Sequence, residues 1–541
     1  MACAGKPLVK DLSPSHLKGE PMPLAAGQEL VYYERTQPDW ALVVTALDCP
    51  VQVTIKWDGS DQVQSARLSP ESPSLEFAQA GVAKVSISAE SEGSLGGLSV
   101  RGPSATTVAP ASNLDKPNVL LYMVDTLRRD MVGVYGGPPG LTPHWDNFAT
   151  DSTVYEQMVA ASGWTKPSLA TIFTGVHPRA HGANSPTAQI RPEFPTLAEL
   201  LLERGYSTAG FTPNPTVDEK FGFARGFQAW SNRYLETSAQ IHGRALSWLD
   251  QRDASRPFFL FVHSIDPHDP YYPNPEFGAK FAPEVQVSDY FKVEETPNDE
   301  HSALAVKFNR VQQFLLSPAL GKPEHALDLK KLYQAEVAYN DSTFGALVEA
   351  LKARDLYDST LIVFVSDHGE EFREHGGWLH GGQVIQELVW LPLMVHFPGA
   401  TVKPGRNSEP VGHVDLFSTI LAYSGGAPAN AGRDLRATGP KRAMQCLAVP
   451  PGAITEALVD DGWKIVRTTF EGGKDGEKRI STELFDLRND PTEQKNLAAA
   501  RPIRTGYLLA LLDDLEPVAS GEAAEIDKEL HKGLRTLDYL H

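Results

Sequence analysis

Asn118-Val119-Leu120-Leu121-Tyr122-Met123-Val124-Asp125 is the stretch that decides the fold class. A continuous apolar run of this length is typical of a strand buried on both faces of a parallel sheet. Comparable runs occupy residues 257–263 and 359–366. Helical patterns lie between them, as at residues 329–354, where apolar residues recur three and four apart. This alternation predicts an α/β fold with a mostly parallel sheet and helices on both faces.

Side chains that can bind a metal follow each of the three predicted strands. They are Asp125 after the first, His263, Asp266 and His268 after the second, and Asp367 with His368 after the third, followed by His375 and His380. The carboxyl ends of parallel strands meet at one edge of a sheet, so we expect these residues to lie together. Carboxylate and imidazole suit Zn²⁺ or Mn²⁺. Taken singly, each has an ordinary alternative as a helix cap or a hydrogen-bonded histidine.

Residues 162–175, Ser-Gly-Trp-Thr-Lys-Pro-Ser-Leu-Ala-Thr-Ile-Phe-Thr-Gly, read as a loop that enters a helix. Pro167 suits the first helical turn. The Thr165 hydroxyl then lies at a helix N-terminus, where free N–H groups and the helix dipole favour an anion. This is a suitable place for a nucleophile that attacks a phosphate or sulfate ester. The alternative is that Thr165 only caps the helix.

Composition limits the function classes. The chain has 541 residues, enough for two or three domains, and a net charge of -19, which argues against nucleic-acid binding. No apolar run is long enough to span a membrane. The three cysteines, Cys3, Cys49 and Cys446, form neither a disulfide framework nor a CxxC metal site. Cys49 and Cys446 are expected to be buried thiols.

The N-terminal residues Met1-Ala2-Cys3-Ala4-Gly5 resemble the end of a bacterial lipoprotein signal, although the preceding apolar stretch is absent. A lipidated Cys3 implies a membrane tether and a periplasmic or cell-surface location. The alternative is a chance match.

The predicted domains follow changes in sequence pattern along the chain. They are a tether at 1–27, a β-sandwich at 28–103, a linker at 104–115, a catalytic domain at 116–454 and a small α+β subdomain at 455–541. Residues 273–323 look like a surface insertion that frames substrate. The β-sandwich is either a packing module or a polysaccharide-binding domain.

Several motifs between about residues 116 and 498 resemble the sulfatase branch of the alkaline phosphatase superfamily. They are Pro117-Asn118-Val119 with Asp125, the Thr165 stretch with 174–182, Pro267-His268-Asp269-Pro270-Tyr271, Ser366-Asp367-His368-Gly369-Glu370, 391–393 with 398–399, 413–416, and 483–493 with 496–498. The resemblance implies an alkaline-phosphatase/sulfatase-like sheet and a divalent metal site.

The departures from the sulfatase pattern concern the chemistry. Sulfatases of the family carry Cys/Ser-x-Pro-x-Arg, whose first residue becomes formylglycine, whereas this chain has Thr165-Lys166-Pro167-Ser168-Leu169. Asp125-Thr126 replaces two adjacent acids. The Lys and His expected after the Gly-Tyr-x-Thr element are replaced by residues 211–215. His380 stands thirteen residues after Asp367, where a sulfate-binding lysine is expected.

These departures are similar to the threonine-nucleophile members: phosphoethanolamine transferases, lipoteichoic acid synthases and nucleotide phosphodiesterases. The resemblance implies one metal on Asp125, Thr165, Asp367 and His368, with His268 and His380 on a second metal or acting on the leaving group. Lys166 and Asn214 are candidates for contacting phosphoryl oxygens. His263 and His375 would support the ligands.

The resulting prediction is a metal-dependent hydrolase of phosphoric esters, either phosphodiesters or phosphonate monoesters, with Thr165 as nucleophile. A transferase variant would resolve the phosphothreonine with an alcohol. Zn²⁺ or Mn²⁺ is the expected cofactor, as one or two ions, with Ca²⁺ or Mg²⁺ as alternatives. The expected substrates are small-molecule, lipid or glycan esters. The alternatives are a sulfuric ester hydrolase and a non-catalytic polysaccharide-binding surface protein.

Overall fold

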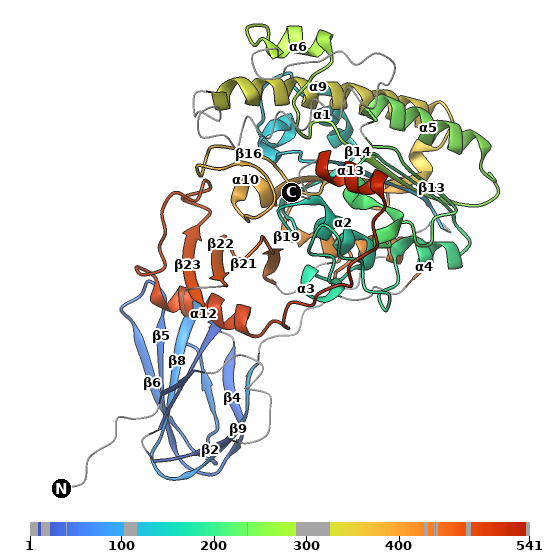
Figure 1. Cartoon of the computed structure of the whole chain (residues 1–541). Helices are drawn as coiled ribbons and strands as arrows, with labels where there is room; N and C mark the ends of the chain where they lie inside the picture. Colours follow the sequence, from blue (N-terminus) through green and yellow to red (C-terminus); the bar gives the residue numbers. More distant parts are fainter. Residues whose placement is uncertain are drawn as a thin grey trace. The chain divides into compact units, whose positions relative to one another are not determined.

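The computed structural model describes residues 9–11, 22–26, 28–38, 40–101, 116–234, 236–287, 325–426, 431–437, 439, 442–471 and 478–536. The chain forms two compact units (Figure 1). The first comprises residues 1–106, 457–468 and 479–517, and the second comprises 107–456, 469–478 and 518–541. Cys3, the linker at 104–115 and most of the predicted insertion lie outside the described residues. The predicted domain boundaries therefore stay predictions.

The larger unit is built on an eight-stranded sheet of order β13-β12-β14-β10-β15-β18-β11-β19. Its strands are β10 (Asn118–Val124), β11 (Thr153–Val159), β12 (Ser207–Thr212), β13 (Ala229–Asn232), β14 (Phe258–Ser264), β15 (Thr360–Ser366), β18 (Trp390–His396) and β19 (Gly405–Gly412). β10 pairs in parallel with both β14 and β15. Only the pairings of β18 with β15 and β11 are antiparallel among the described ladders of this sheet. The predicted mostly parallel α/β fold is confirmed.

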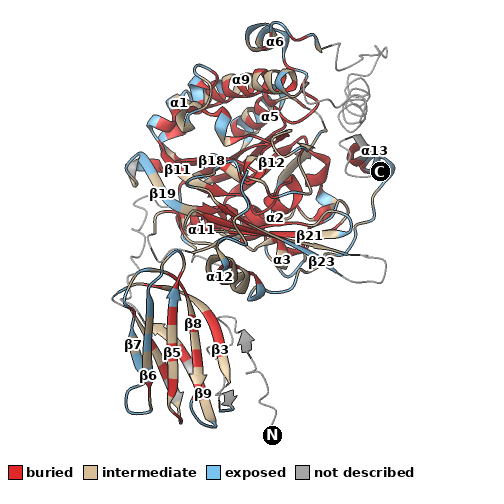
Figure 2. Cartoon of the chain, turned by 90° about the vertical axis from the view of Figure 1, so that its left-hand side faces the viewer, coloured by how far each residue is buried: buried red, intermediate tan, exposed pale blue. Residues whose placement is uncertain are grey.

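Helices cover both faces of this sheet (Figure 2). One face carries α1 (Pro143–Thr150), α5 (Ser238–Gln251) and α9 (His325–Lys352). The other carries α2 (Thr165–Thr174) and α11 (His413–Tyr423), with α4 (Leu197–Glu203) packed against both of these helices. Alternation along β14 explains why its whole run is apolar. Phe258, Leu260 and Val262 join the core cluster of the first face, whereas Phe261 meets Phe173 of α2 with ring centroids 5.0 Å apart.

Shorter elements complete this unit. They are α3 (Pro178–His181), α6 (Pro275–Phe281), α10 (Gln386–Val389), α13 (Lys528–Thr536), the 3₁₀ turns η4 (Pro215–Val217) and η5 (Glu219–Phe221), and the hairpin β16 (Glu371–Phe372) with β17 (Trp378–Leu379). Among the residues described, the helices include none long and apolar enough to cross a membrane.

The smaller unit contains a β-sandwich. One sheet has the order β1-β3-β8-β5-β6 and the other β2-β9-β4-β7. Their strands are β1 (Val9–Asp11), β2 (Met22–Leu24), β3 (Glu29–Thr36), β4 (Ala41–Leu47), β5 (Val51–Trp57), β6 (Val63–Leu68), β7 (Ser74–Glu76), β8 (Gly81–Ala89) and β9 (Gly93–Arg101). Val53 and Ile55 from one sheet share a core with Leu42 and Leu98 from the other, as inward-facing residues of a sandwich do.

The C-terminal part of the chain adds a four-stranded antiparallel sheet, of order β20-β21-β22-β23. Its strands are β20 (Met444–Ala448), β21 (Ala453–Asp460), β22 (Trp463–Phe470) and β23 (Arg479–Asp486), and α12 (Pro502–Asp513) follows. Within the smaller unit, α12 packs against β3 and β8.

Candidate active site

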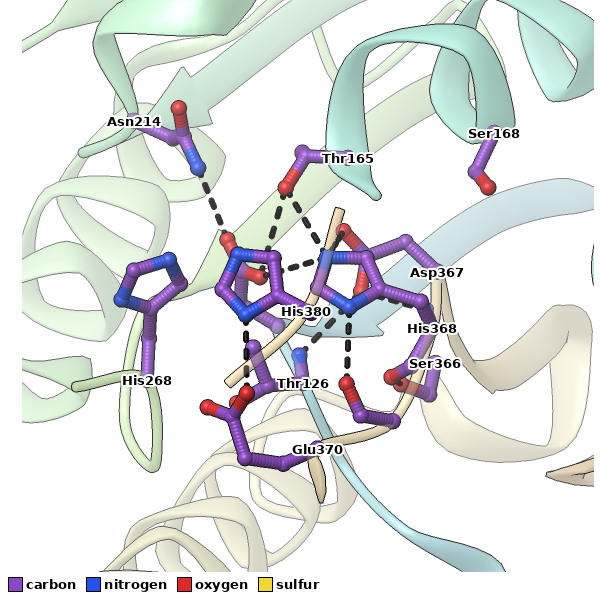
Figure 3. Close-up of polar contacts among 12 residues, drawn as sticks. Thr126, Thr165, Ser168, Asn214, His268, Ser366, Asp367, His368, Glu370 and His380 are labelled. Carbon is purple, nitrogen blue, oxygen red and sulfur yellow. Dashed lines mark hydrogen bonds and ion pairs between the residues drawn. The ribbon is translucent and has the colours of Figure 1, made fainter. Parts of the chain in front are cut away.

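Thr165 is the first residue of α2, and its side chain faces one carboxylate and one imidazole. Its Oγ1 lies 3.2 Å from Nε2 of His368 and 3.4 Å from Oδ1 of Asp125 (Figure 3). Trp164, not Thr165, occupies the N-cap position. The hydroxyl is therefore not used to cap the helix; it is directed into the site, where the helix dipole favours negative charge.

Asp125 follows β10 and is fully buried. Nδ2 of Asn214 donates to its Oδ2 at 2.9 Å, and Nε2 of His263 lies 3.0 Å from the same oxygen. The other ring nitrogen of His263 lies 2.9 Å from the Thr212 hydroxyl. These contacts hold one carboxylate oxygen in place and leave Oδ1 facing Thr165. Two elements, the η4 turn and β14, thus orient the carboxylate.

Asp367 follows β15, the strand next to β10. Its Oδ1 accepts hydrogen bonds from the backbone N–H groups of Thr126 at 3.2 Å and His368 at 2.9 Å. Its Oδ2 is buried and has no hydrogen-bond partner among the residues described. Burial raises the pKa of Asp367 well above its usual range, and the neighbouring Asp125 carboxylate raises it further. A cation bound between these two neighbouring carboxylates would offset their mutual repulsion.

Three imidazoles share one arrangement of ring nitrogens. Nδ1 of His368 lies 2.9 Å from the Gly369 carbonyl, and Nδ1 of His268 lies 2.7 Å from the Asp269 carbonyl. Nδ1 of His380 lies 2.9 Å from the Glu370 carboxylate. A backbone carbonyl only accepts, so Nδ1 of His368 and Nδ1 of His268 each carry a proton, and Nε2 of either ring keeps a lone pair when that ring is neutral. The rings of His368 and His380 are 4.4 Å apart, and those of His268 and His380 are 4.9 Å apart.

The contact between Glu370 and His380 follows from the hairpin β16–β17. Its antiparallel register pairs Glu371 with Leu379 and Phe372 with Trp378. One step further out, the same register places residue 370 opposite residue 380. Sequence reasoning did not assign a role to Glu370, because strands of two residues give no readable pattern.

The first group of residues fits a divalent metal. From Nε2 of His368 it is 3.2 Å to Thr165 Oγ1, 3.5 Å to Asp125 Oδ1 and 3.4 Å to Asp367 Oδ2. Ligands at tetrahedral corners around Zn²⁺ are separated by about 3.4 Å. The unsatisfied Asp367 Oδ2 belongs to the same set. The residues implied by the resemblance are therefore brought together at a spacing that a metal would span.

A second group joins His268 and His380 to Asp269, whose ligand atoms lie within 4.8 Å of one another. The sequence motif that contains Asp269 does not by itself predict a ligand role for this residue. The acid suggested from the second strand end, Asp266, instead holds the start of α5, because it accepts from the Ser238 N–H at 2.8 Å. Nε2 of His375 lies 3.1 Å from Glu387, which is not one of the predicted metal ligands, so the supporting role of His375 stays a prediction.

Lys166 points away from Thr165. It is fully buried, and its Nζ donates to the carbonyls of Pro186 at 2.7 Å and Ser185 at 3.3 Å. The same nitrogen lies 3.1 Å from the centre of the Phe221 ring. Burial lowers the pKa of Lys166 well below its usual range. Its proposed contact with substrate would require these interactions to break.

Comparison with known proteins identifies the family of this chain. A sulfatase family profile matches residues 117–426, more than half of the chain. This chain belongs to the sulfatase family. The protein described as uncharacterized sulfatase YidJ of Escherichia coli K12 is 24% identical over 468 residues, which cover 75% of this chain and 88% of that protein. Choline-sulfatase of Rhizobium meliloti is 24% identical over 446 residues, covering 71% and 82%.

Solved structures of the family share the fold. A protein in complex with its substrate D-glucosamine-2-N,6-O-disulfate matches with a TM-score of 0.60 and 20% identity, covering 74% of this chain and 97% of that one. The phosphonate monoester hydrolase of Agrobacterium radiobacter matches with a TM-score of 0.58 and 20% identity, covering 74% and 95%. At these identities the matches establish the fold.

As a member of the sulfatase family, this protein is an ester hydrolase of the alkaline phosphatase superfamily, as predicted from its sequence. Its named relatives are mostly sulfatases, which favours the sulfuric ester alternative over the phosphoric ester prediction. The relatives do not support a threonine nucleophile, phosphodiester hydrolysis, zinc or a lipid anchor. Those points stay predictions.

Proposed function

We propose that this sulfatase-family hydrolase cleaves monoanionic phosphoric esters, namely phosphodiesters or phosphonate monoesters, with Thr165 as the nucleophile. The observation that carries the proposal is the placement of Thr165 Oγ1 between Asp125 Oδ1 and His368 Nε2 at the start of α2. A threonine cannot become formylglycine, so the route by which that aldehyde releases sulfate is closed to it.

A divalent metal held by Asp125, Thr165, Asp367 and His368 would lower the pKa of the Thr165 hydroxyl and offset charge on the ester oxygens. The chain's own residues then set the direction of attack. The Asn214 amide and the His263 ring hold Asp125, which keeps Oδ1 beside the nucleophile. The Thr165 hydroxyl lies within hydrogen-bond distance of Asp125 Oδ1 and His368 Nε2, and the helix N-terminus favours the anionic ester.

His268 and His380 are suited to opposite proton-transfer roles. Burial opposes charging of His268, but the Asp269, Asp125 and Glu370 carboxylates outweigh it and raise its pKa. Burial, reinforced by His268, lowers the pKa of His380 to about 4. Neighbouring groups whose pKa values are pushed apart are natural acid and base partners. His268 would protonate the leaving alcohol, and neutral His380 would accept a proton from the water that cleaves phosphothreonine.

The second candidate is a sulfuric ester hydrolase, favoured by the sulfatases among the relatives. It uses the same nucleophile and the same metal ligands. A threonine sulfate must be cleaved by water at sulfur, because no neighbouring hydroxyl on the threonine can expel sulfate. Glycan sulfates would be the substrates to test first for this candidate.

The deciding experiment compares nitrophenyl esters of a phosphodiester, a phosphonate monoester, a phosphomonoester and a sulfate on metal-loaded protein and on Thr165→Ala. We expect phosphodiester or phosphonate turnover that the substitution abolishes, and a phosphorylated Thr165 peptide after acid quench. Sulfate turnover exceeding phosphoryl turnover would replace the leading proposal by the second. Turnover unaffected by Thr165→Ala would refute both.

A further inference from the structure

A segment near the C-terminus, residues 518–536, lies along the larger unit and is called the C-terminal strap here (Figure 1, red). Its first half adds to the loop 179–189 by backbone hydrogen bonds. These are Ala519 N–H to Arg179 O at 2.7 Å, Gly521 N–H to Gly182 O at 2.9 Å, Gln189 N–H to Glu522 O at 2.9 Å and Ala524 N–H to Thr187 O at 2.8 Å. These four hydrogen bonds, with the isolated antiparallel bridge between Ala188 and Ala523, hold the loop to the strap.

The loop that the strap holds supports the nucleophile. Its Ser185 and Pro186 carbonyls accept from Nζ of Lys166, the residue after Thr165. Lys166 is fully buried, so these carbonyls fix the first turn of α2 from the side opposite the site. A shift of the loop would therefore move the backbone that carries Thr165.

The second half of the strap is the helix α13, which packs on the turn η4. Leu530 and Leu534 are buried. A Cβ added at Gly533 would lie 3.1 Å from Cβ of Pro215 and 2.9 Å from the Tyr234 ring, so the helix is in tight contact there. Pro215 follows Asn214, whose amide holds Asp125.

We propose that the C-terminal strap is a positioning element for the active site, which sets both the nucleophile and the carboxylate beside it. One end braces the loop behind Lys166 and Thr165, and the other end braces the turn that carries Asn214. The inference rests on the proposed role of Thr165 and Asn214. It adds a distant segment whose displacement lowers turnover without any contact to substrate.

Two substitutions displace the strap at its two ends. Gly533→Ala pushes α13 away from Pro215. Gly521→Ala places a methyl group against the Gln189 carbonyl oxygen, which belongs to the backbone and cannot move aside as a flexible side chain would. His531→Ala, on the exposed side of α13, is the matched control. We expect kcat to fall by about tenfold or more in both glycine variants, since small misplacements of reacting groups are costly. KM should change little.

Hydrogen–deuterium exchange supplies a readout besides activity. Faster exchange is expected at 209–218 in Gly533→Ala and at 182–190 in Gly521→Ala, with the central strands protected as in wild type. Unchanged kcat in both glycine variants alongside faster exchange would overturn the inference. So would a loss of kcat with faster exchange throughout the sheet, which indicates unfolding. If Thr165→Ala retains turnover, the proposed function fails instead, whatever the strap variants do.

Discussion

Asn214→Ser separates two roles of one side chain. The Asn214 Oδ1 accepts from the Thr216 N–H at 2.8 Å and so caps η4, whereas Nδ2 donates to Asp125 at 2.9 Å. Serine caps as well as asparagine does, but its hydroxyl is too short to reach Asp125 as well. The substitution therefore removes the hydrogen bond to the carboxylate and keeps an acceptor for the Thr216 N–H. It also alters the contact in which the Thr216 hydroxyl donates to Asn214 Oδ1 at 2.7 Å.

The expected magnitude follows from that single bond. A hydrogen bond to a charged group contributes about 1.5–3 kcal/mol. If this stabilisation is needed to keep Oδ1 of Asp125 beside Thr165, kcat/KM should fall roughly tenfold to a hundredfold, because 1.36 kcal/mol corresponds to a factor of ten. The remaining contact from His263 prevents a complete loss.

The assay measures kcat and KM on the best nitrophenyl ester, with urea unfolding of the same samples. Asn407→Ser is the control, since Asn407 accepts from the Glu409 N–H at 2.8 Å in the same local turn without contacting the site. It should match wild type in kinetics. A kcat/KM for Asn214→Ser within roughly twofold of wild type would refute the idea that Asn214 orients Asp125 for catalysis.

Four further expectations concern charged side chains of the protein and the charge of the substrate. Lys166→Met should lower the unfolding free energy by about 1–3 kcal/mol, since two carbonyls lose their donor, yet leave KM unchanged, as denaturation and kinetics would show. Asp367→Asn should abolish the stabilisation that bound metal gives, which for the wild type is about 2.7 kcal/mol at a metal concentration a hundredfold above Kd. Without metal, the variant should unfold no more easily than the wild type, because it lacks the repulsion between Asp367 and Asp125. Calorimetry with and without a chelator measures both effects. Burial opposes ionisation of Glu374, but Arg128 and Lys330 lower its pKa to about 2. This lowered pKa contributes stability above the unfolded-state value that is lost as pH falls toward 2, so Glu374→Gln should flatten acid unfolding below about pH 4.5. Phosphomonoesters should be turned over more slowly than phosphodiesters in the nitrophenyl panel.

The strand-end residues could be predicted because hydrophobic pattern and parallel topology act together. The buried runs at 118–124, 258–264 and 360–366 form the strands β10, β14 and β15, and β10 lies between the other two. These strands carry Asp125, His263 and Asp367, respectively, to one edge of the sheet. Nothing in that argument depends on side-chain detail. The prediction needs only the hydrophobic periodicity of the sequence, the order of the strands along the chain and their parallel direction.

Lys166 and Glu370 show why the remainder could not be predicted. Successive residues on a helix point about 100° apart, so Lys166 cannot face the same site as Thr165 at the start of α2. The sequence shows only that they are adjacent. Glu370 meets His380 through the register of a hairpin with two-residue strands, and pairing that short leaves no alternation to read. Asp266 likewise went to Ser238, a partner from a distant helix.

The balance of charge favours substrates with one negative charge. The arginine of the family motif is Leu169 here, and the lysine expected near residue 380 is a histidine whose pKa is lowered to about 4. Lys166 is turned toward Pro186. A divalent cation would offset the Asp125 and Asp367 carboxylates. His268, whose pKa the Asp269 carboxylate raises against the effect of burial, would offset that carboxylate when protonated. Such a site has no surplus positive charge to hold a dianion out of water. Phosphodiesters, phosphonate monoesters and sulfate esters are all monoanions, so this argument narrows the substrate class and leaves the choice between phosphorus and sulfur to the chemistry of Thr165.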